Sequence, residues 1–354
     1  MNTQYVRAVA IVVALLLVVA PTVPVTAEST QRSVQTSFEE RQRCAMDAVV
    51  GDPSDDRAVL EAARAGTNAG VCDARAAGAR YTAQQYQRVF LGARDGAIEA
   101  MNVENNTERY TLADVQNASR GAARAALSNA QGSSPELLYD VAFGGAFGAL
   151  RAIDVDDYSA SFAEAAAEGG VTGALTAGRE SGGTATSRTM TYAAYGGASG
   201  AMLGVGQQYN ESIVLQNVSA LYTEIRALTP EPSAVGSGNA GSSSPTQTFD
   251  DVVSSASGAA HGAVEATQQR TVQGVKTTAA ETMAAAFGSA WSAANSASEA
   301  DTRTGATERA ASLGASKALS TSDAARSSAS TTTDSLNRLV QLAYEYTTEL
   351  FDGQ

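Results

Sequence analysis

Pairs of small residues, four positions apart, recur about every 26 residues along this chain. The pattern is clearest in three segments that begin with two glycines and place a third glycine four residues after the first: Gly144–Leu150, Gly169–Leu175 and Gly196–Met202. Weaker copies lie at positions 66/70, 92/96, 121/125, 258/262, 284/288 and 310/314. Glycine inside a helix costs about 1 kcal/mol relative to alanine, so its recurrence requires a compensating interaction. Residues four apart share one face of a helix, and two small residues there let a second helix approach closely.

This spacing predicts an all-α fold. A period of about 26 residues accommodates one helix of about 18 residues and a connection of about eight. Turn-forming residues separate the repeats, as in Gln131–Pro135 and Ser181–Gly183. We expect an antiparallel array, or bundle, in which consecutive helices cross at their small residues. The predicted crossing glycines are Gly144, Gly148, Gly169, Gly173, Gly196 and Gly200.

Changes of composition predict four parts in the chain. Residues 1–27 are expected to form a signal peptide, and residues 28–229 a helical repeat domain that ends in an amphipathic helix over 213–228. Residues 230–248 are rich in Gly, Ser and Pro and predict a flexible linker. Residues 249–354 predict a second helical region, rich in Ala, Ser and Thr, with Phe287 and Trp291 as its main apolar anchors.

The amino terminus has the order of a secretory signal peptide. Arg7 precedes an apolar run over residues 8–20, and Pro21 and Pro24 lead to a cleavage site after Ala27. The alternative is a retained membrane anchor, but the run is shorter than the roughly 20 residues that span a bilayer. We therefore expect Sec-type export, cleavage after Ala27 and an extracellular or cell-surface location.

Two further features agree with export. Cys44 and Cys72 are the only cysteines, and such a pair in an exported protein is expected to form a disulfide; two buried thiols are the alternative. Four N-glycosylation sequons occur in two loop-like zones, at Asn105, Asn117, Asn210 and Asn217.

Composition limits the partners and indicates a salty environment. The 37 acidic and 24 basic residues give a formal charge of −13, which argues against nucleic acid and anionic membranes as partners. The basic residues include two lysines only. The acidic, Lys-poor and Ala/Gly-rich chain resembles exported proteins of halophilic archaea in composition, without matching a named family. In molar salt the Debye length falls to about 3 Å, so a carboxylate-rich surface repels itself little. An acidic protein from any organism with a GC-rich genome is the alternative.

The sequence nominates no catalytic, cofactor-binding or metal-binding residue. One histidine and two cysteines exclude zinc sites built from several such ligands. His261 has no evident nucleophile and acid to work with, and residues 154–157 lack the glycine and the distal glutamate of a calcium loop. The glycine-rich segments lack the Lys-Ser/Thr of a phosphate loop. We expect no cofactor.

These observations favour an exported, glycosylated structural or interaction protein of the cell surface or extracellular space, and not an enzyme. Its expected partners are itself, as a homo-oligomer, or other surface proteins. One alternative is a membrane-active protein whose glycine-bearing helices insert and oligomerise, with residues 137–153 as the best candidate. Charged residues in the neighbouring helices, such as Glu164 and Arg179, argue against insertion. The other alternative is an unrecognised secreted enzyme.

Overall fold

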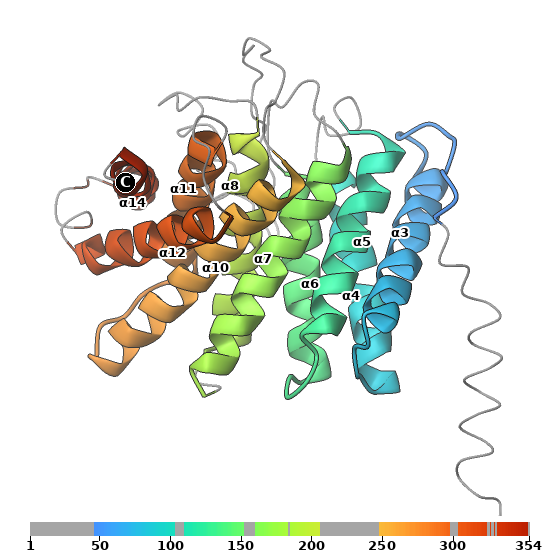
Figure 1. The fold of residues 1–354 in the computed structure, drawn as a ribbon, viewed down its shortest axis with the longest axis horizontal. Helices are drawn as coiled ribbons and strands as arrows, with labels where there is room; N and C mark the ends of the chain where they lie inside the picture. The colour runs from blue at the N-terminus through green and yellow to red at the C-terminus, as the bar shows by residue number, and fades with distance from the viewer. Residues whose placement is uncertain are drawn as a thin grey trace, which may run out of the picture. The chain divides into compact units, whose positions relative to one another are not determined.

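The computed structural model describes residues 46–102, 110–151, 160–182, 185–205, 248–297, 304–323, 326, 329 and 331–352. Every regular element within these residues is an α-helix, which confirms the all-α prediction (Figure 1). The helices are α3 (Asp56–Ala76), α4 (Ala83–Asn102), α5 (Leu112–Ser128), α6 (Pro135–Ala149), α7 (Ala160–Glu180), α8 (Ser187–Gly204), α10 (Phe249–Val272), α11 (Ala279–Ala297), α12 (Thr304–Ser320) and α14 (Thr332–Asp352). The predicted signal peptide, the helix expected over 213–228 and nearly all of the predicted linker lie outside the described residues.

Successive helices alternate between two layers. The first layer contains α3, α5, α7, α10 and α12, and the second contains α4, α6, α8, α11 and α14. Each helix packs most extensively against the next helix of its own layer, and less extensively against its chain neighbours in the other layer. Figure 1 shows the helices side by side in chain order, with a progressive change of tilt from α3 to α12. The structure is therefore a stack of helical pairs.

The crossing glycines hold each layer together. A Cβ placed on Gly169 would lie 2.3 Å from the carbonyl oxygen of Val253, and one on Gly173 would lie 2.1 Å from that of Ser257. Real Cβ atoms essentially never come within 3.0 Å of another atom in this way, so only glycine allows α7 and α10 to approach so closely. The same geometry places Gly144 and Gly148 against Thr191 and Tyr195, and Gly196 and Gly200 against Met283 and Phe287.

These contacts correct the predicted crossing pattern. The sequence led us to expect crossings between consecutive helices, but the six predicted crossing glycines meet the next helix of the same layer, as in α6 with α8. Crossings between consecutive helices do occur, at the adjacent glycines Gly145, Gly170 and Gly197. Two glycines four residues apart meet two carbonyls that are also four residues apart and in the same order, so helices of one layer run parallel. Consecutive helices still run antiparallel, because they belong to different layers.

The two predicted helical regions form one body. α10 packs on α7 and α11 packs on α8, although 44 residues separate α8 from α10 in the chain. Residues 44–354 form one compact unit. Phe287 and Trp291, the predicted anchors of the second region, are fully buried. The helices α10, α11, α12 and α14 therefore continue the stack that α3 to α8 begin.

Local chemistry fixes where the helices begin. Thr111 and Asp114 form a capping box at the start of α5, and Thr248 and Asp251 form another at the start of α10. At the start of α6 the Ser134 hydroxyl oxygen accepts a hydrogen bond from the N–H of Leu137. Each cap satisfies backbone N–H groups that have no partner within the helix.

Four short turns join the layers at one end of the stack. Each contains a glycine with positive φ: 84° at Gly78, 80° at Gly132, 66° at Gly182 and 78° at Gly274. This left-handed conformation at a helix carboxyl terminus favours glycine over any residue with a Cβ. Because the helices of each layer are parallel, all four turns lie at the same end, the lower edge in Figure 1. We call this the turn end.

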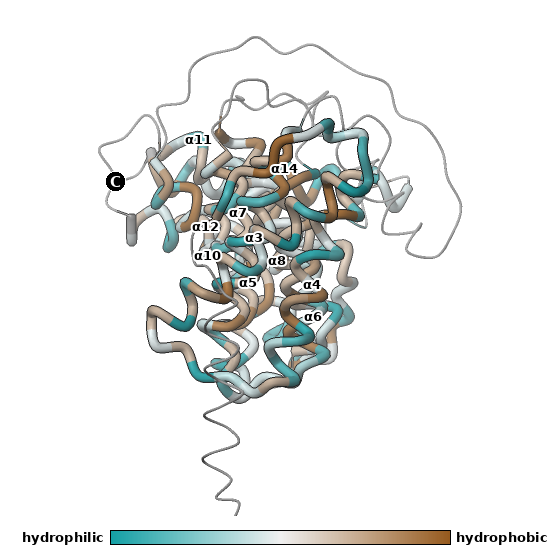
Figure 2. Tube along the Cα trace, turned by 90° about the vertical axis from the view of Figure 1, so that its right-hand side faces the viewer, coloured by the Kyte–Doolittle hydropathy of each residue, from teal (hydrophilic) through white to brown (hydrophobic). Residues whose placement is uncertain are grey.

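The core is built largely from alanine, with few bulky side chains. Hydrophilic and hydrophobic residues are interleaved along the helices (Figure 2), and no helix in the described ranges is long and apolar enough to cross a membrane. α6, which overlaps most of the segment considered for insertion, has 15 residues.

Replacing Gly173 by Leu should disrupt the contact between α7 and α10. The new side chain would meet the backbone of Ser257, and overpacking of this kind costs about 1–3 kcal/mol or more. Gly305→Leu is the matched control, because a Cβ at the exposed Gly305 meets nothing within 4 Å. Chemical denaturation of both variants in the same salt measures the free energy of unfolding; equal values would contradict the role given to Gly173.

Candidate functional site

A row of charged side chains links the first three helices of the first layer. Arg120 on α5 reaches back to Asp73 on α3, with 2.7 Å between Nε and Oδ2, and forward to Glu164 on α7 at 3.5 Å. Arg124, one turn further along α5, contacts Glu164 at 3.0 Å and also pairs with Glu168. These five residues alternate in sign across three helices. We call them the charged row.

The charged row consists of partly shielded groups. The Glu164 side chain is 8% exposed, whereas both arginines are about one quarter exposed. Burial raises the pKa of Glu164, while the positive charges of Arg124 and Arg120 act against that rise. The hydrogen bond to Asp73 raises the pKa of Arg120. The pKa of Glu164 is raised overall, so the arginines offset only part of the desolvation of this carboxylate while their ion pairs link the three helices.

The equivalent groove of the second layer contains aromatic side chains. The rings of Tyr139 and Phe143 on α6 stack with centroids 6.4 Å apart, and those of Phe143 and Phe147 with centroids 5.6 Å apart. Phe147 then meets Tyr195 on α8 at 5.4 Å, and the Tyr139 hydroxyl lies 3.3 Å from an oxygen of Asp95 on α4. The three α6 rings are partly exposed and so lie at the surface.

One backbone rule explains both grooves. The carbonyls of Arg120 and Glu164 lie against glycines of the preceding first-layer helix, and those of Tyr139 and Phe143 lie against glycines of α4. A residue in this position places its side chain in the groove between two parallel helices. The residues in this position are charged at Arg120 and Glu164 and aromatic at Tyr139 and Phe143, whereas further along the stack both layers have uncharged, non-aromatic residues there, such as Ser257.

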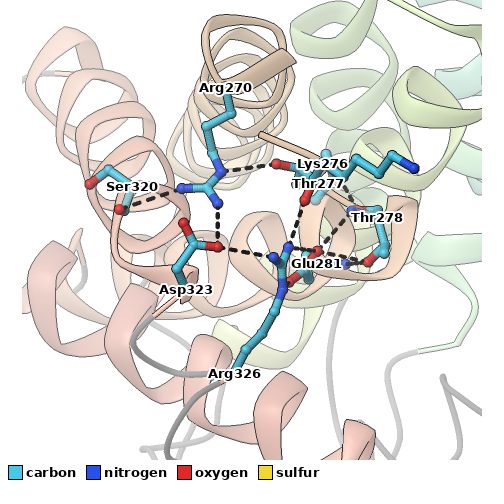
Figure 3. Close-up of polar contacts among 9 residues, drawn as sticks. Arg270, Lys276, Thr277, Thr278, Glu281, Ser320, Asp323 and Arg326 are labelled. Atoms are coloured by element: carbon cyan, nitrogen blue, oxygen red, sulfur yellow. Dashed lines mark hydrogen bonds and ion pairs between the residues drawn. The ribbon is translucent and has the colours of Figure 1, made fainter. Parts of the chain in front are cut away.

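A second charged cluster ties the end of α12 to the turn between α10 and α11 (Figure 3). It contains Arg270 from α10, Glu281 from α11, and Asp323 and Arg326 from the segment after α12. We call these four residues the α12 cluster. Arg270 is 7% exposed and donates hydrogen bonds to Asp323 at 2.9 Å and to the hydroxyl of Thr277 at 3.0 Å.

Arg326 contributes most of the contacts in the α12 cluster. Its guanidinium donates to both carboxylate oxygens of Glu281, at 2.5 and 2.7 Å, and to Asp323 at 2.9 Å. It also donates to the carbonyl oxygen of Lys276 at 2.8 Å. Burial raises the pKa of Glu281, but the hydrogen bonds from Arg326 and Thr278 outweigh that effect, and the pKa is lowered overall. Glu281 therefore stays ionised and serves as a structural anchor.

The predicted site residues are only partly within the described residues. Asn105, Asn210, Asn217 and Cys44 lie outside them, and Cys72 is buried on α3. The Cys44–Cys72 disulfide therefore stays a prediction.

We expected Asn117 to lie in a loop because of its sequon, but the structure places it in a helix. It lies within α5, and its side-chain amide donates to the carbonyl oxygen of Ala113 at 2.8 Å. Ser119, the third residue of that sequon, is buried and donates to the carbonyl oxygen of Val115. The folded helix thus engages both side chains of this sequon.

His261 on α10 pairs with Glu180 at the end of α7, with 2.7 Å between Nε2 and Oε2. The pair connects adjacent helices of the first layer. Groups of three or more His, Cys, Asp or Glu that could hold a metal ion do not occur among the residues that the structure describes.

Sequence reasoning missed the charged row and the α12 cluster. Their members come from helices about 45 residues apart, and no local pattern pairs them. One local signal existed: Thr278 and Glu281 have the spacing of a capping box, and Glu281 accepts from the Thr278 N–H at 2.7 Å.

Comparison with protein-family models, curated proteins and solved structures finds no match for this chain. The fold defines this chain as a two-layer stack of helical pairs.

Replacing Glu281 by Gln should destabilise the protein at neutral pH. The change leaves Arg326 without its carboxylate, and breaking a partly buried pair of this kind costs about 1–3 kcal/mol after allowing for the exposure of Arg326. Because the pKa of Glu281 is lowered on folding, its stabilising effect is present above the ordinary value of 4.5 and is lost as the pH falls through the lower, folded value.

The difference in free energy of unfolding between wild type and Glu281→Gln should therefore shrink as the pH falls below 4.5 and through the lower pKa of the folded Glu281. Glu349→Gln is the control, since Glu349 pairs with Lys317 on the surface at 3.4 Å and should matter by less than about 1 kcal/mol. Denaturation curves across pH measure both effects. Equal losses for the two variants at neutral pH would contradict the role of Glu281.

Proposed function

We propose that this chain is an exported protein of a high-salt environment that works by binding, as a structural or interaction component of the cell surface, and not as a catalyst. The observation that carries the proposal is the two-layer stack. Repeated helices packed side by side create extended side surfaces, and repeat proteins use such surfaces for binding.

The described charged groups support the same proposal. The arginines of the charged row and of the α12 cluster each contact carboxylates on other helices, so they are engaged in holding the stack together. A catalytic group needs a polar atom directed at a substrate. The Arg-rich, Lys-poor composition suits this arrangement, because the planar guanidinium pairs with two carboxylate oxygens at once.

Export is tested by locating the chain among the cell fractions and by identifying its first residue. Intact-mass analysis of the surface and medium fractions should show a protein that begins at Glu28, with one disulfide between Cys44 and Cys72. The expectation rests on Arg7, the apolar run over residues 8–20 and the small residues before Glu28. A full-length chain in the cytoplasm would contradict the proposed location.

Salt dependence tests the proposed environment. Removal of residues 1–27 takes away Arg7, their only charged residue, and changes the formal charge from −13 to −14. Dilution from molar salt to about 0.01 M lengthens the Debye length from about 3 to about 30 Å, so carboxylates across the surface then repel one another. Circular dichroism should show high helicity in molar KCl, a sharp fall on dilution and recovery when salt returns. Equal helicity at both salt levels would exclude adaptation to high salt.

A further inference from the structure

Aromatic side chains recur at one position of the second layer. The residues whose backbone packs against Gly96, Gly148 and Gly200, the second crossing glycine of each helix, are all aromatic. They are Phe143 on α6, Tyr195 on α8 and Phe287 on α11. The first layer has Arg120 and Ser257 against the corresponding glycines, Gly70 and Gly173. An aromatic ladder therefore runs along the second layer from α6 to α11.

The ladder is buried at one end and open at the other. Tyr195 is 6% exposed and Phe287 is 1% exposed, and each contacts another aromatic ring. On α6, by contrast, Tyr139, Phe143 and Phe147 are all partly exposed. We call these three residues the α6 rings. They are the part of the ladder that another molecule reaches.

The ring geometry favours a protein partner over a sugar. A sugar binds an aromatic side chain by lying on an open ring face. Tyr139 and Phe147 stack on Phe143 from both sides along the helix, with interplanar angles of 24° and 13°. The edge of Phe143 is what remains open, and an aromatic edge packs well against another ring.

The surroundings of the α6 rings are nearly neutral. α4, α6 and the adjoining Arg151 together contain three arginines and four carboxylates, a net charge of −1. They are Arg88, Arg94 and Arg151, and Asp95, Glu99, Glu136 and Asp140. Arg88 pairs with Glu136 across the two helices at 3.7 Å, and Arg94 pairs with Asp95. A second copy of the chain, with its own formal charge of −13, therefore meets little net repulsion at this face.

The face has the size of a small specific interface. α4 has 20 residues and α6 has 15, so their common face measures roughly 25 by 20 Å, or about 500 Å². Two copies in contact then bury about 1,000 Å² in total, which is at the lower limit for a specific interface. A dimer through this face is therefore expected to dissociate in the micromolar range.

The α6 rings also have the spacing that a two-fold contact requires. They lie one helical turn apart, with Phe143 in the middle. A two-fold axis through Phe143 places each Tyr139 against the second copy's Phe147, so every ring meets another ring. Phe147 already packs on Tyr195 within the chain, with centroids 5.4 Å apart, and a second copy repeats this kind of contact.

We propose that the α6 rings and the adjoining surface of α4 form the contact surface of a two-fold homodimer. The inference rests on the proposed function as a binding protein, and it names a second copy of the chain as the partner. Molar salt screens the repulsion between two acidic chains beyond about 3 Å and leaves apolar contact between rings intact.

Sedimentation velocity of the mature chain in molar KCl, at a series of micromolar concentrations, tests the proposal. The test variant is Phe143→Glu, which buries two like charges at the two-fold axis. The matched control is Leu313→Glu, because Leu313 is 47% exposed on α12, which packs on α10, α11 and α14. Thermal melts show whether each variant folds. If Phe143→Glu lowers the melting temperature, Phe143→Gln, which adds no charge, takes its place.

The wild type should form dimers, the variant at Phe143 should raise the dimer Kd at least about tenfold, and the control should stay within about twofold of wild type. A monomeric wild type would overturn the proposal, as would equal changes in the two variants. The result is independent of export: a monomer found at the cell surface would refute only the dimer, whereas a dimer confined to the cytoplasm would refute only the location.

Discussion

The contact between a glycine and a backbone carbonyl of the next helix in the same layer is the interaction on which the rest of this structure depends. It brings helices such as α7 and α10 closer than side chains permit, with 2.1 Å between a Cβ placed on Gly173 and the Ser257 oxygen. This close approach lets a core made largely of alanine be well packed, because small side chains fill only narrow spaces. The charged row, which bridges α3, α5 and α7, depends on helices held at this distance.

Polar contacts then determine how the stacked helices are joined across their exposed grooves. Arg120 and Arg124 link α3, α5 and α7 through carboxylates that burial would otherwise penalise. Arg326 does the same at the other end of the stack, where it ties the segment after α12 to Glu281. In both places the arginine bonds to more than one group, so its loss would leave several partners unsatisfied.

The sequence predicted the helices and their small-residue faces, because both follow from spacing within one helix. It could not predict which helix each glycine meets, since the same pair of glycines fits a parallel or an antiparallel neighbour equally well. Phe287 and Trp291 were identified as anchors because they are large residues in a poor apolar background. Arg326 and Glu281 could not be paired in advance, because 45 residues separate them and only the tertiary structure brings them together.

The parallel order within each layer sets the unit by which such a chain can grow or shrink. Removing one helix would move every later helix into the opposite layer and reverse its direction. Removing or duplicating two consecutive helices keeps every later helix in its layer. Length variation in this architecture is therefore restricted to whole pairs, whereas the connections between pairs can differ widely in length, as the one between α8 and α10 does.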